Sequence, residues 1–430
     1  MRTVAIVGKN FGDEGKGLAT DFFSRRAEKP LVVRHNGGAQ SGHTVELKNA
    51  AGKSFVFHEL SSGSFRNAAT LWSDTYYPDL YKLGEEAERF RAAAGFLPEI
   101  LTTEDTCATL PDDVLINMAL EASRGDRRHG SCGMGINECD LRTRAGYGLR
   151  LGDLGRMNER GAYYELRRIR KRYIRARLAE IGDTLTAAAE EYLALLDDDN
   201  VLKNAAAAML AHLRYVNLLT ETDLKNRLAE TDALIFEAGQ GLLLDRGNKE
   251  YAPHLTASDT GLINPCAFLS RFGLPLDEAV YVSRAYVTKH GAGPLPCECP
   301  REELGALERD RTNEPNAWQG RLRYACHESE AAFVSHVRRD LSRAAGTPRV
   351  SLFLTHLNET GNCVVLNGRR VPAESFLRLP EIESTFQRFY LSDSRYSDDV
   401  RTAAAETAAS SVRGQAQTRT DSPAADAGNA

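Results

Sequence analysis

Long hydrophobic runs are absent from this chain of 430 residues. No segment approaches the roughly 18 to 20 uninterrupted apolar residues that a membrane-spanning helix needs. The first eight residues contain only a handful of apolar side chains, too few for the core of a signal peptide. Repeats with periods of about 20 to 50 residues are also missing, which excludes solenoids and propellers. We therefore expect a cytoplasmic protein with no membrane partner.

The chain also lacks a surplus of charge of one sign. It has 54 Lys and Arg against 59 Asp and Glu, a formal net charge of -5. Nucleic-acid-binding domains usually carry a basic surplus, so we expect no nucleic-acid partner. The eight cysteines include no CxxC pair, because a single residue separates Cys297 from Cys299. Reduced, mostly buried thiols are expected rather than metal ligands or a disulfide framework.

What is present is the composition of a globular protein, with 42% hydrophobic and 26% charged residues. At about 150 residues per domain the length allows three domains, but one large α/β body fits equally well. Short β-rich runs alternate with helical stretches, a pattern typical of buried parallel strands joined by helical crossovers. The sequence therefore predicts an α/β fold with a large, mainly parallel sheet flanked by helices, and strands at 3–7, 30–34, 233–236, 278–282 and 349–354.

Two other regions differ from this alternation. Residues 165–218 predict two or three helices, with Leu166 and Ile169 at helical spacing among seven Lys and Arg between positions 167 and 177. We interpret these basic residues as a solvated face rather than a phosphate site. Residues 401–430 are rich in Ala, Ser, Thr and Asp and predict a partly disordered tail.

A glycine-rich turn, GKNFGDEGKG at 8–17, follows the first predicted strand and leads into a helix. Backbone amides at such a turn bind anions, and Lys16 adds a mobile positive charge for phosphate oxygens. The turn is not a Walker A loop, because its glycine spacing is longer and Gly17 stands where that motif has Ser or Thr. An acidic residue inside a phosphate loop repels the phosphates unless it binds a metal or moves a proton. Asp13 is therefore predicted to do one or both.

A second polar cluster, RHNGGAQSGHT at 34–44, follows the second predicted strand. Its glycines allow close backbone approach to a ligand, and Gln40, His43 and Thr44 offer hydrogen bonds. Open α/β sheets bind ligands at the carboxyl ends of their strands, where this loop is expected.

With these two motifs the chain resembles adenylosuccinate synthetase, the ligase that joins aspartate to C6 of inosine monophosphate (IMP) with hydrolysis of GTP. GDEGKG at 12–17 and NGGxxxGHT at 36–44 are the first matches. Others follow in family order from residue 3 to about 360, and more weakly to about 395: GLRLGDL at 148–154 to GLRVGDL, FEAGQG at 236–241 to FEGAQG, LTAS at 255–258 to VTSSN, GAGPLP with Glu298 to GAGPFPTE, and GRLR at 320–323 to GRRRR.

The resemblance implies a P-loop-NTPase-like adenylosuccinate synthetase fold and a role in purine nucleotide (AMP) biosynthesis. It implies one catalytic domain over 1–400 with a helical insertion at about 155–230, one Mg²⁺ per subunit and a homodimer. The substrates would be a purine nucleoside monophosphate, a nucleoside triphosphate and aspartate.

The resemblance also assigns roles to single residues. Asp13 matches the general base and a metal ligand, the carbonyl of Gly42 matches a second metal ligand, and His43 matches the general acid. The amino-acid substrate would meet Gln319, Gly320 and Arg321. The residues expected to bind nucleotide or phosphate are Gly12, Glu14, Gly15, Lys16, Gly17, Gln40, Ser41, Gly42, Thr44, Ser131, Cys132, Gln240, Thr256, Arg323, His356 and Asn358.

Two loops depart from the family pattern. The TTGRGIGP segment that helps bind the monophosphate appears as SCGMGINE at 131–138, and the arginine that a partner subunit lends falls at Gly146, with Arg142 and Arg144 nearby. The ATTGR loop for aspartate appears as AWQGR at 317–321. A different amino acid, or a different way of holding aspartate, stays open.

The base of the triphosphate is a third point of departure. The family's TKLD appears as THLN at 355–358, and STGPDR is reduced to SDSR at 392–395. Asn358 offers one acceptor and one donor group in place of a carboxylate that pairs with guanine, so it suits adenine equally well. GTP and ATP both stay open. The alternatives are a diaminopurine-type or specialised synthetase that uses (d)GMP or another amino acid with ATP, and a non-catalytic nucleotide-binding regulator.

Overall fold

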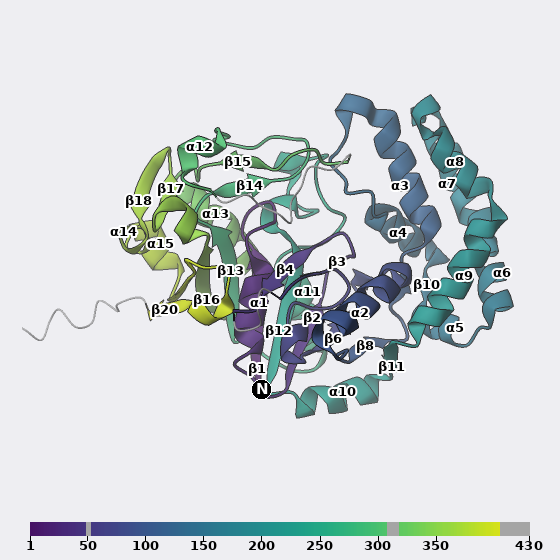
Figure 1. Cartoon of the computed structure of the whole chain (residues 1–430), viewed down its shortest axis with the longest axis horizontal. Helices are drawn as coiled ribbons and strands as arrows, with labels where there is room; N and C mark the ends of the chain where they lie inside the picture. The colour runs from purple at the N-terminus through teal and green to yellow at the C-terminus, as the bar shows by residue number, and fades with distance from the viewer. Residues whose placement is uncertain (49–52, 308–317, 405–430) are drawn as a thin grey trace, which may run out of the picture.

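A ten-stranded sheet organises the residues that the computed structural model describes, which are 1–48, 53–307 and 318–404 (Figure 1). All neighbouring strands are parallel except the last two. The mainly parallel α/β sheet predicted from the sequence is thus confirmed. The strands are, in sheet order, β11 (Val216–Leu219), β8 (Ile100–Thr103), β6 (Ala69–Trp72), β2 (Pro30–Arg34), β12 (Ala233–Gly241), β1 (Arg2–Gly8), β13 (Glu278–Arg284), β16 (Arg349–Thr355), β19 (Arg388–Leu391) and β20 (Arg401–Ala404).

Helices cover the sheet and also lie beyond both of its edges. In Figure 1, α3 to α9 form a lobe beside the edge that carries β8 and β11, and α12 to α15 lie toward the opposite edge. The helices are α1 (Lys16–Ser24), α2 (Leu80–Ala94), α3 (Pro111–Arg124), α4 (Ile136–Arg142), α5 (Leu151–Gly155), α6 (Glu159–Ile169), α7 (Arg175–Ile181), α8 (Glu190–Asp197), α9 (Asp199–Leu213), α10 (Glu221–Glu230), α11 (Ile263–Arg271), α12 (Arg301–Leu304), α13 (Glu330–Leu341), α14 (Ala373–Leu377) and α15 (Pro380–Thr385).

Short two-stranded ribbons project from the connections between these elements. They pair β3 (Gly37–Gly38) with β7 (Tyr76–Tyr77), β4 (His43–Glu46) with β5 (Ser54–Phe57), β9 (Cys107–Ala108) with β10 (Leu149–Arg150), β14 (Val287–Lys289) with β15 (Arg323–Ala325), and β17 (Cys363–Leu366) with β18 (Arg369–Pro372). Two of them, β3/β7 and β14/β15, follow directly on strands β2 and β13 of the main sheet.

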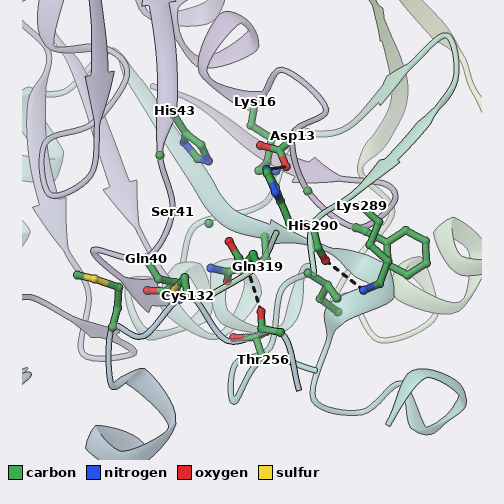
Figure 2. A pocket seen from close by; sticks show the side chains of 18 of the residues that line it. Asp13, Lys16, Gln40, Ser41, His43, Cys132, Thr256, Lys289, His290 and Gln319 are labelled. Atoms are coloured by element: carbon green, nitrogen blue, oxygen red, sulfur yellow. Dashed lines mark hydrogen bonds and ion pairs between the residues drawn. The ribbon is translucent and has the colours of Figure 1, made fainter. Parts of the chain in front are cut away.

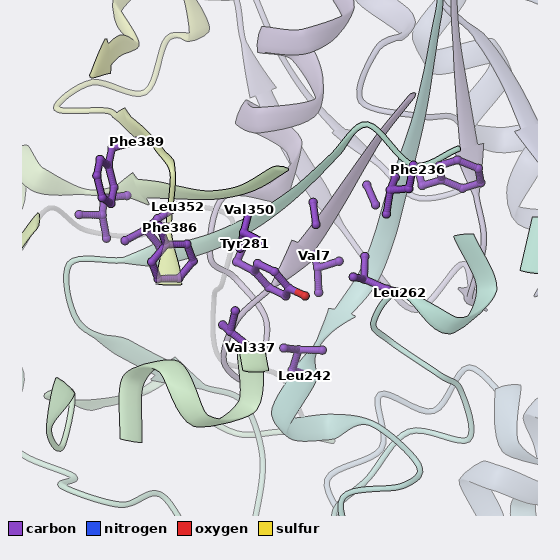
Figure 3. Close-up of a cluster of buried hydrophobic side chains, with 14 of the residues drawn as sticks. Val7, Phe236, Leu242, Leu262, Tyr281, Val337, Val350, Leu352, Phe386 and Phe389 are labelled. Atoms are coloured by element: carbon purple, nitrogen blue, oxygen red, sulfur yellow. The ribbon is translucent and has the colours of Figure 1, made fainter. Parts of the chain in front are cut away.

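Both faces of the sheet are buried, as a parallel sheet between helical layers requires. Successive side chains of β1 point to opposite faces: Ala5 and Val7 belong to one apolar cluster, and Val4 and Ile6 to another. The first cluster continues across β12, β13 and β16 to the helix α13 (Figure 3). This core fixes the carboxyl ends of the central strands at one edge.

The insertion expected at about 155–230 differs from the structure in its last part. Residues 216–219 form β11, which pairs in parallel with β8 at the sheet edge, and α10 follows it. Four-residue strands such as β11, β8 and β6 are too short to show a period of two in the sequence. Of the tail predicted at 401–430, residues 401–404 form β20, and the remainder lies outside the described residues.

The basic residues between 167 and 177 do not all lie on a solvated face, so that interpretation was wrong for two of them. Arg170 is 5% exposed and its guanidinium binds the carboxylate of Asp112 at 2.7 and 2.9 Å. Arg177 binds Glu138, which is buried on α4. A buried guanidinium needs such a partner, and both partners lie outside the helix that the sequence pattern considered.

All eight cysteines lie in the described residues and carry free thiols. Four are buried and Cys297 is exposed. The helices that the structure describes include none with the length and apolar character to cross a bilayer.

Among the ion pairs of the described residues, the pair of Arg142 and Asp113 is the most deeply buried, because both side chains are 0% exposed. Its guanidinium also donates to the carbonyls of Ala108 and Tyr147. Arg142 is thus committed inside the lobe, whereas Arg144 is exposed beside Asp140.

We predict that Arg142→Met lowers the free energy of unfolding by about 3–5 kcal/mol, because it leaves the Asp113 carboxylate buried without its ion-pair partner. Arg150→Met is the control: it removes an exposed pair with Asp105 and should cost less than about 1 kcal/mol. Denaturant unfolding curves measure both. Equal effects of the two variants would contradict the prediction.

Candidate functional site

A cavity of about 1150 Å³ opens at the carboxyl ends of the central strands. Its described lining comes from the segments that follow β1, β2, β12, β13 and β16, and from α3, α4 and the connection between them. Ligands of open α/β sheets bind in this position. Figure 2 shows Asp13, Lys16, His43 and His290 pointing into one space, with Gln40 and Cys132 on the facing wall.

The phosphate loop is shaped from within by the carboxylate of Glu14. It accepts hydrogen bonds from the amides of Asn10 at 3.0 Å and Gly12 at 2.8 Å, and from Lys16 Nζ at 2.7 Å. Burial opposes ionisation of Glu14, but Lys16 and the loop amides lower its pKa. The structure places Glu14 below the loop, outside the described lining of the cavity, where it orders the loop rather than facing a ligand.

Two glycines allow the loop to take this shape. Gly12 and Gly15 have φ angles of 105° and 94°, which residues with a Cβ rarely adopt. Gly15 precedes the first turn of α1, so the amide end of that helix faces the cavity together with Gly17 and Lys16. This arrangement suits phosphate oxygens.

Asp13 projects its carboxylate into the cavity and has a φ of 59°. His290 Nε2 lies 3.4 Å from Asp13 Oδ2, and Arg284 Nε donates to the Asp13 carbonyl at 2.5 Å. Sequence reasoning missed both partners, although they follow the strand predicted at 278–282.

His43 is paired with a buried acid on β12. Its Nδ1 lies 2.7 Å from Glu237 Oε1, and Glu237 also accepts from the amide of Ser62 at 3.1 Å and from its hydroxyl. Burial lowers the pKa of His43, and Glu237 opposes this shift. Burial would raise the pKa of Glu237, but His43, Arg34 and Ser62 lower it to about 2. A carboxylate therefore accepts the Nδ1 proton and leaves His43 Nε2, which has no partner among the described residues, as the free position.

Gln40 and Gln240 lie on the facing wall of the cavity. Both polar atoms of Gln40 are buried and lack a partner in the part of the chain that the structure describes. Gln240 accepts from Asn36 Nδ2 at 3.0 Å, which leaves its amide group for a ligand. Ser41 is engaged instead by Arg34, at 2.6 Å. The other expected residues of this region on the lining are Gly42, Thr44 and Thr256.

The loop in the position of the monophosphate segment is held by α3. Ser131 Oγ donates to Asn117 Oδ1 at 2.9 Å and accepts from the amide of Gly133 at 3.2 Å. Cys132 lines the cavity, and burial raises the pKa of its thiol to about 11. This loop therefore offers neutral donors rather than charge.

Only part of the segment expected to bind the amino acid lies on the cavity wall. Gln319 lines the cavity and donates to the carbonyl of Gly130 at 3.0 Å, whereas the described lining includes neither Gly320 nor the exposed Arg321. Arg323 also lies outside that lining, paired with Glu298 at 2.8 Å. The first residue of the motif, Ala317, lies outside the described residues.

The segment after β16 reaches the cavity through His356 and Asn358. Thr355 Oγ1 donates to the carbonyl of Glu14 at 2.7 Å and lies 2.8 Å from His356 Nδ1. This contact ties the segment in the position of the base-reading motif to the phosphate loop.

Oxygen donors for a hard cation are present, because the Asp13 carboxylate and the segment of Gly42 both line the cavity. Among the described residues no group of three His, Cys, Asp or Glu could hold a metal ion by itself. This donor set fits an ion such as Mg²⁺, which uses few protein ligands and takes the rest from phosphate and water.

Known proteins similar to this chain agree with the family resemblance of its motifs. The family model described as adenylosuccinate synthetase matches residues 5–329. The chain is 29% identical over 333 residues to an adenylosuccinate synthetase of Thermosynechococcus vestitus and 30% over 338 residues to that of Trichormus variabilis, which in each case covers 75% of this chain and 68% of the relative.

Two solved structures share the fold. The fully ligated adenylosuccinate synthetase from Plasmodium falciparum has a TM-score of 0.63 at 18% identity, covering 93% of this chain and 99% of that one. The succinoaminodeoxyadenylate synthetase of cyanophage S-2L, bound to dGMP and to dATP as an energy donor, has a TM-score of 0.58 at 16% identity, covering 94% and 96%.

The lowered pKa of Glu237 predicts a pH dependence of stability. A carboxyl whose pKa falls from 4.5 to about 2 on folding contributes about 3 kcal/mol that is fully present above pH 4.5 and is lost as the pH falls toward 2. The difference in unfolding free energy between wild type and Glu237→Gln should be constant from pH 7 to 5 and shrink below pH 4.5. Urea unfolding at several pH values measures it. Glu230→Gln, at an exposed acid, is the control, and a pH-independent difference for Glu237→Gln would contradict the assignment.

Proposed function

The chain belongs to the adenylosuccinate synthetase family, and from this premise we propose that it joins the amino group of aspartate to C6 of a 6-oxopurine nucleoside monophosphate, driven by a nucleoside triphosphate. An enzyme of the ligase type is what its relatives support. The observation that carries the proposal is that Asp13 and Lys16, from the phosphate loop, and His43, from the segment after β2, line one cavity.

The first step activates the purine. The 6-oxo group is a poor leaving group, so Asp13 takes the N1 proton and O6 forms a bond to the γ-phosphorus while the bond to the diphosphate breaks. Lys16 and the amides of the phosphate loop hold the phosphate oxygens. In the second step the amino group of aspartate attacks C6, and the bond from C6 to O6 breaks with release of inorganic phosphate. Both substrates must therefore reach the space between Asp13 and His43.

His43 acts through its Nε2. While Nδ1 donates its proton to Glu237, the neutral ring has a lone pair at Nε2 and so accepts rather than donates. To donate to the transferred phosphoryl group the ring must first take up a proton. The Glu237 carboxylate and the bound phosphates favour that imidazolium, because both place negative charge beside it. Glu237 thus holds the ring in the orientation that general-acid catalysis needs.

Mg²⁺ belongs to this proposal as the counter-ion of the phosphates. Asp13 and the carbonyl of Gly42 would hold it, and when bound it neutralises charge on the triphosphate. The ability of Asp13 to take the N1 proton then rests on its position relative to the purine.

Aspartate is the proposed amino donor, with Arg321 as the carboxylate partner by its position in the motif. The neighbouring Gln319 already lies on the cavity wall. The expected homodimer and cytoplasmic location are part of the same proposal, as is a single catalytic domain over 1–400.

For the triphosphate we propose that ATP is accepted. Asn358, in place of the family's aspartate, lines the cavity, and an amide pairs with the donor and acceptor edge of adenine. The cyanophage synthetase, which shares this fold, is bound to dATP as an energy donor. The identity of the monophosphate is a separate question, so the test includes (d)GMP, the substrate of a diaminopurine-type synthetase, beside IMP.

The test is phosphate release with IMP, GMP and dGMP, each combined with GTP or ATP and with aspartate or another amino acid. Release should require both the monophosphate and the amino acid, and Asp13→Ala should abolish it without changing the thermal unfolding midpoint. Asp105→Ala, at an exposed acid, is the control and should keep full activity. Substantial turnover by Asp13→Ala would contradict the mechanism, and triphosphate binding without turnover in wild type would favour a regulator.

We further predict that Asn358→Asp raises the ratio of kcat/KM for GTP over ATP by about 10-fold or more, since a carboxylate accepts both guanine donors. Asn362→Asp, at an exposed position near the same segment, should leave the ratio unchanged. Steady-state kinetics with each triphosphate measure it. An unchanged ratio for Asn358→Asp would exclude this residue from base recognition.

A further inference from the structure

A chain of buried hydrogen bonds connects the backbone of Asp13 to the segment after β16. Arg284, the last residue of β13, donates through Nε to the Asp13 carbonyl at 2.5 Å and through Nη1 to Tyr286 Oη at 2.9 Å. Tyr286 Oη donates to Glu359 Oε2 at 2.5 Å. Glu359 follows Asn358 directly in the chain. Residues far apart in the sequence are thereby joined along the wall of the cavity, which all three side chains line.

The donors and acceptors of this chain run in one direction. Arg284 is 6% exposed, Tyr286 1% and Glu359 9%. Burial raises the pKa of Tyr286, so its hydroxyl keeps its proton and can accept from Arg284 while donating to Glu359. A charged donor at one end and a carboxylate at the other strengthen both hydrogen bonds, and burial of the three side chains strengthens them further.

The backbone that Arg284 holds is one that needs support. Asp13 has a left-handed φ of 59°, which costs energy for a residue with a side chain. The preceding residue is Gly12, with a φ of 105°, and a glycine restricts the backbone least of all residues. Without a bond to its carbonyl, the peptide of Asp13 can rotate and turn the carboxylate away from the cavity. On the next residue, Thr355 holds the carbonyl of Glu14 from the same side.

We propose that Arg284 is a positioning residue that fixes the carboxylate of Asp13, and that Tyr286 and Glu359 hold Arg284 so that the catalytic loop and the segment of His356 and Asn358 move as one unit. This inference rests on the proposed function, because it takes Asp13 as the proton acceptor. Arg284, Tyr286 and Glu359 line the cavity, but in this role they act on Asp13 through its backbone carbonyl and do not need to touch a substrate. Its loss should therefore lower kcat more than it raises KM.

The test begins with Tyr286→Phe, which removes the bridging hydroxyl and keeps the ring. We expect kcat to fall about 10-fold or more, with KM for both nucleotides changed less than about 2-fold and an unfolding midpoint close to that of wild type. Tyr390→Phe is the matched control. It removes a buried hydrogen bond of 2.8 Å from a tyrosine hydroxyl to Glu278, and neither residue belongs to the described lining of the cavity. The control should keep kcat.

A double-mutant cycle with Arg284→Lys gives the sharper result. If Arg284 and Tyr286 act as one chain, the double variant should lose little more activity than the worse single variant. In the wild-type background, Glu359→Gln keeps an acceptor for the Tyr286 hydroxyl and should retain much more kcat than Tyr286→Phe, which a general loss of stability does not predict. Unchanged kcat in Tyr286→Phe, or additive losses in the cycle, would overturn the inference while wild-type turnover stands. Absence of turnover in wild type would overturn the proposed function and this inference with it.

Discussion

The carboxylate of Glu14 inside the phosphate loop is the interaction on which the site depends. By accepting two loop amides and the Lys16 ammonium, it closes the turn between β1 and α1 around a buried negative charge. This fixes the residues beside Glu14: Asp13 faces outward and Lys16 lies at the start of α1. A buried carboxylate that lost these donors would be costly, so the loop is held in this shape before any ligand binds.

Buried charged groups with fixed hydrogen-bond partners also shape the rest of the cavity. Glu237 holds His43, and Arg34 is held by Ser41 and the carbonyl of Leu60. The net charge of -5 gives no general attraction for anionic nucleotides. Affinity must come from local donors, namely the loop amides, Lys16 and the side chain of Gln40, whose polar atoms have no partner in the described structure. Polar groups fixed in advance need little reorganisation when charge develops on a substrate.

The sequence was sufficient for the parts of the molecule that local patterns encode. Five strands, β1, β2, β12, β13 and β16, were predicted because each is a run of apolar residues followed by a turn, and the phosphate loop was predicted from its glycines and Lys16. The strands β6, β8, β11, β19 and β20 were missed because four residues show no period. Glu237, Arg284 and His290 were missed for a different reason: their partners, His43 and Asp13, lie more than 190 positions away in the chain. Burial of Glu237 within the FEAGQG motif was the one available signal, since an acid at the end of a buried strand needs a partner.

Spacing along the chain also misplaced some residues relative to the cavity. Glu14 and Arg323 lie in motifs that resemble ligand-binding ones, yet the structure pairs them with Lys16 and Glu298. A motif specifies which residues lie near one another, whereas the direction of a side chain depends on the charges that fold against it.

The oxygen atom at C6 of the purine distinguishes the 6-phosphoryl mechanism from simple hydrolysis of the triphosphate. With the 6-oxo group of the purine monophosphate labelled with ¹⁸O, and with triphosphate and aspartate present, we predict one ¹⁸O atom in each inorganic phosphate released, because O6 bonds to the γ-phosphorus before C6 loses it. Mass spectrometry of the phosphate measures the label. Phosphate that carries no ¹⁸O would show that the triphosphate is hydrolysed by water and would contradict the 6-phosphoryl mechanism.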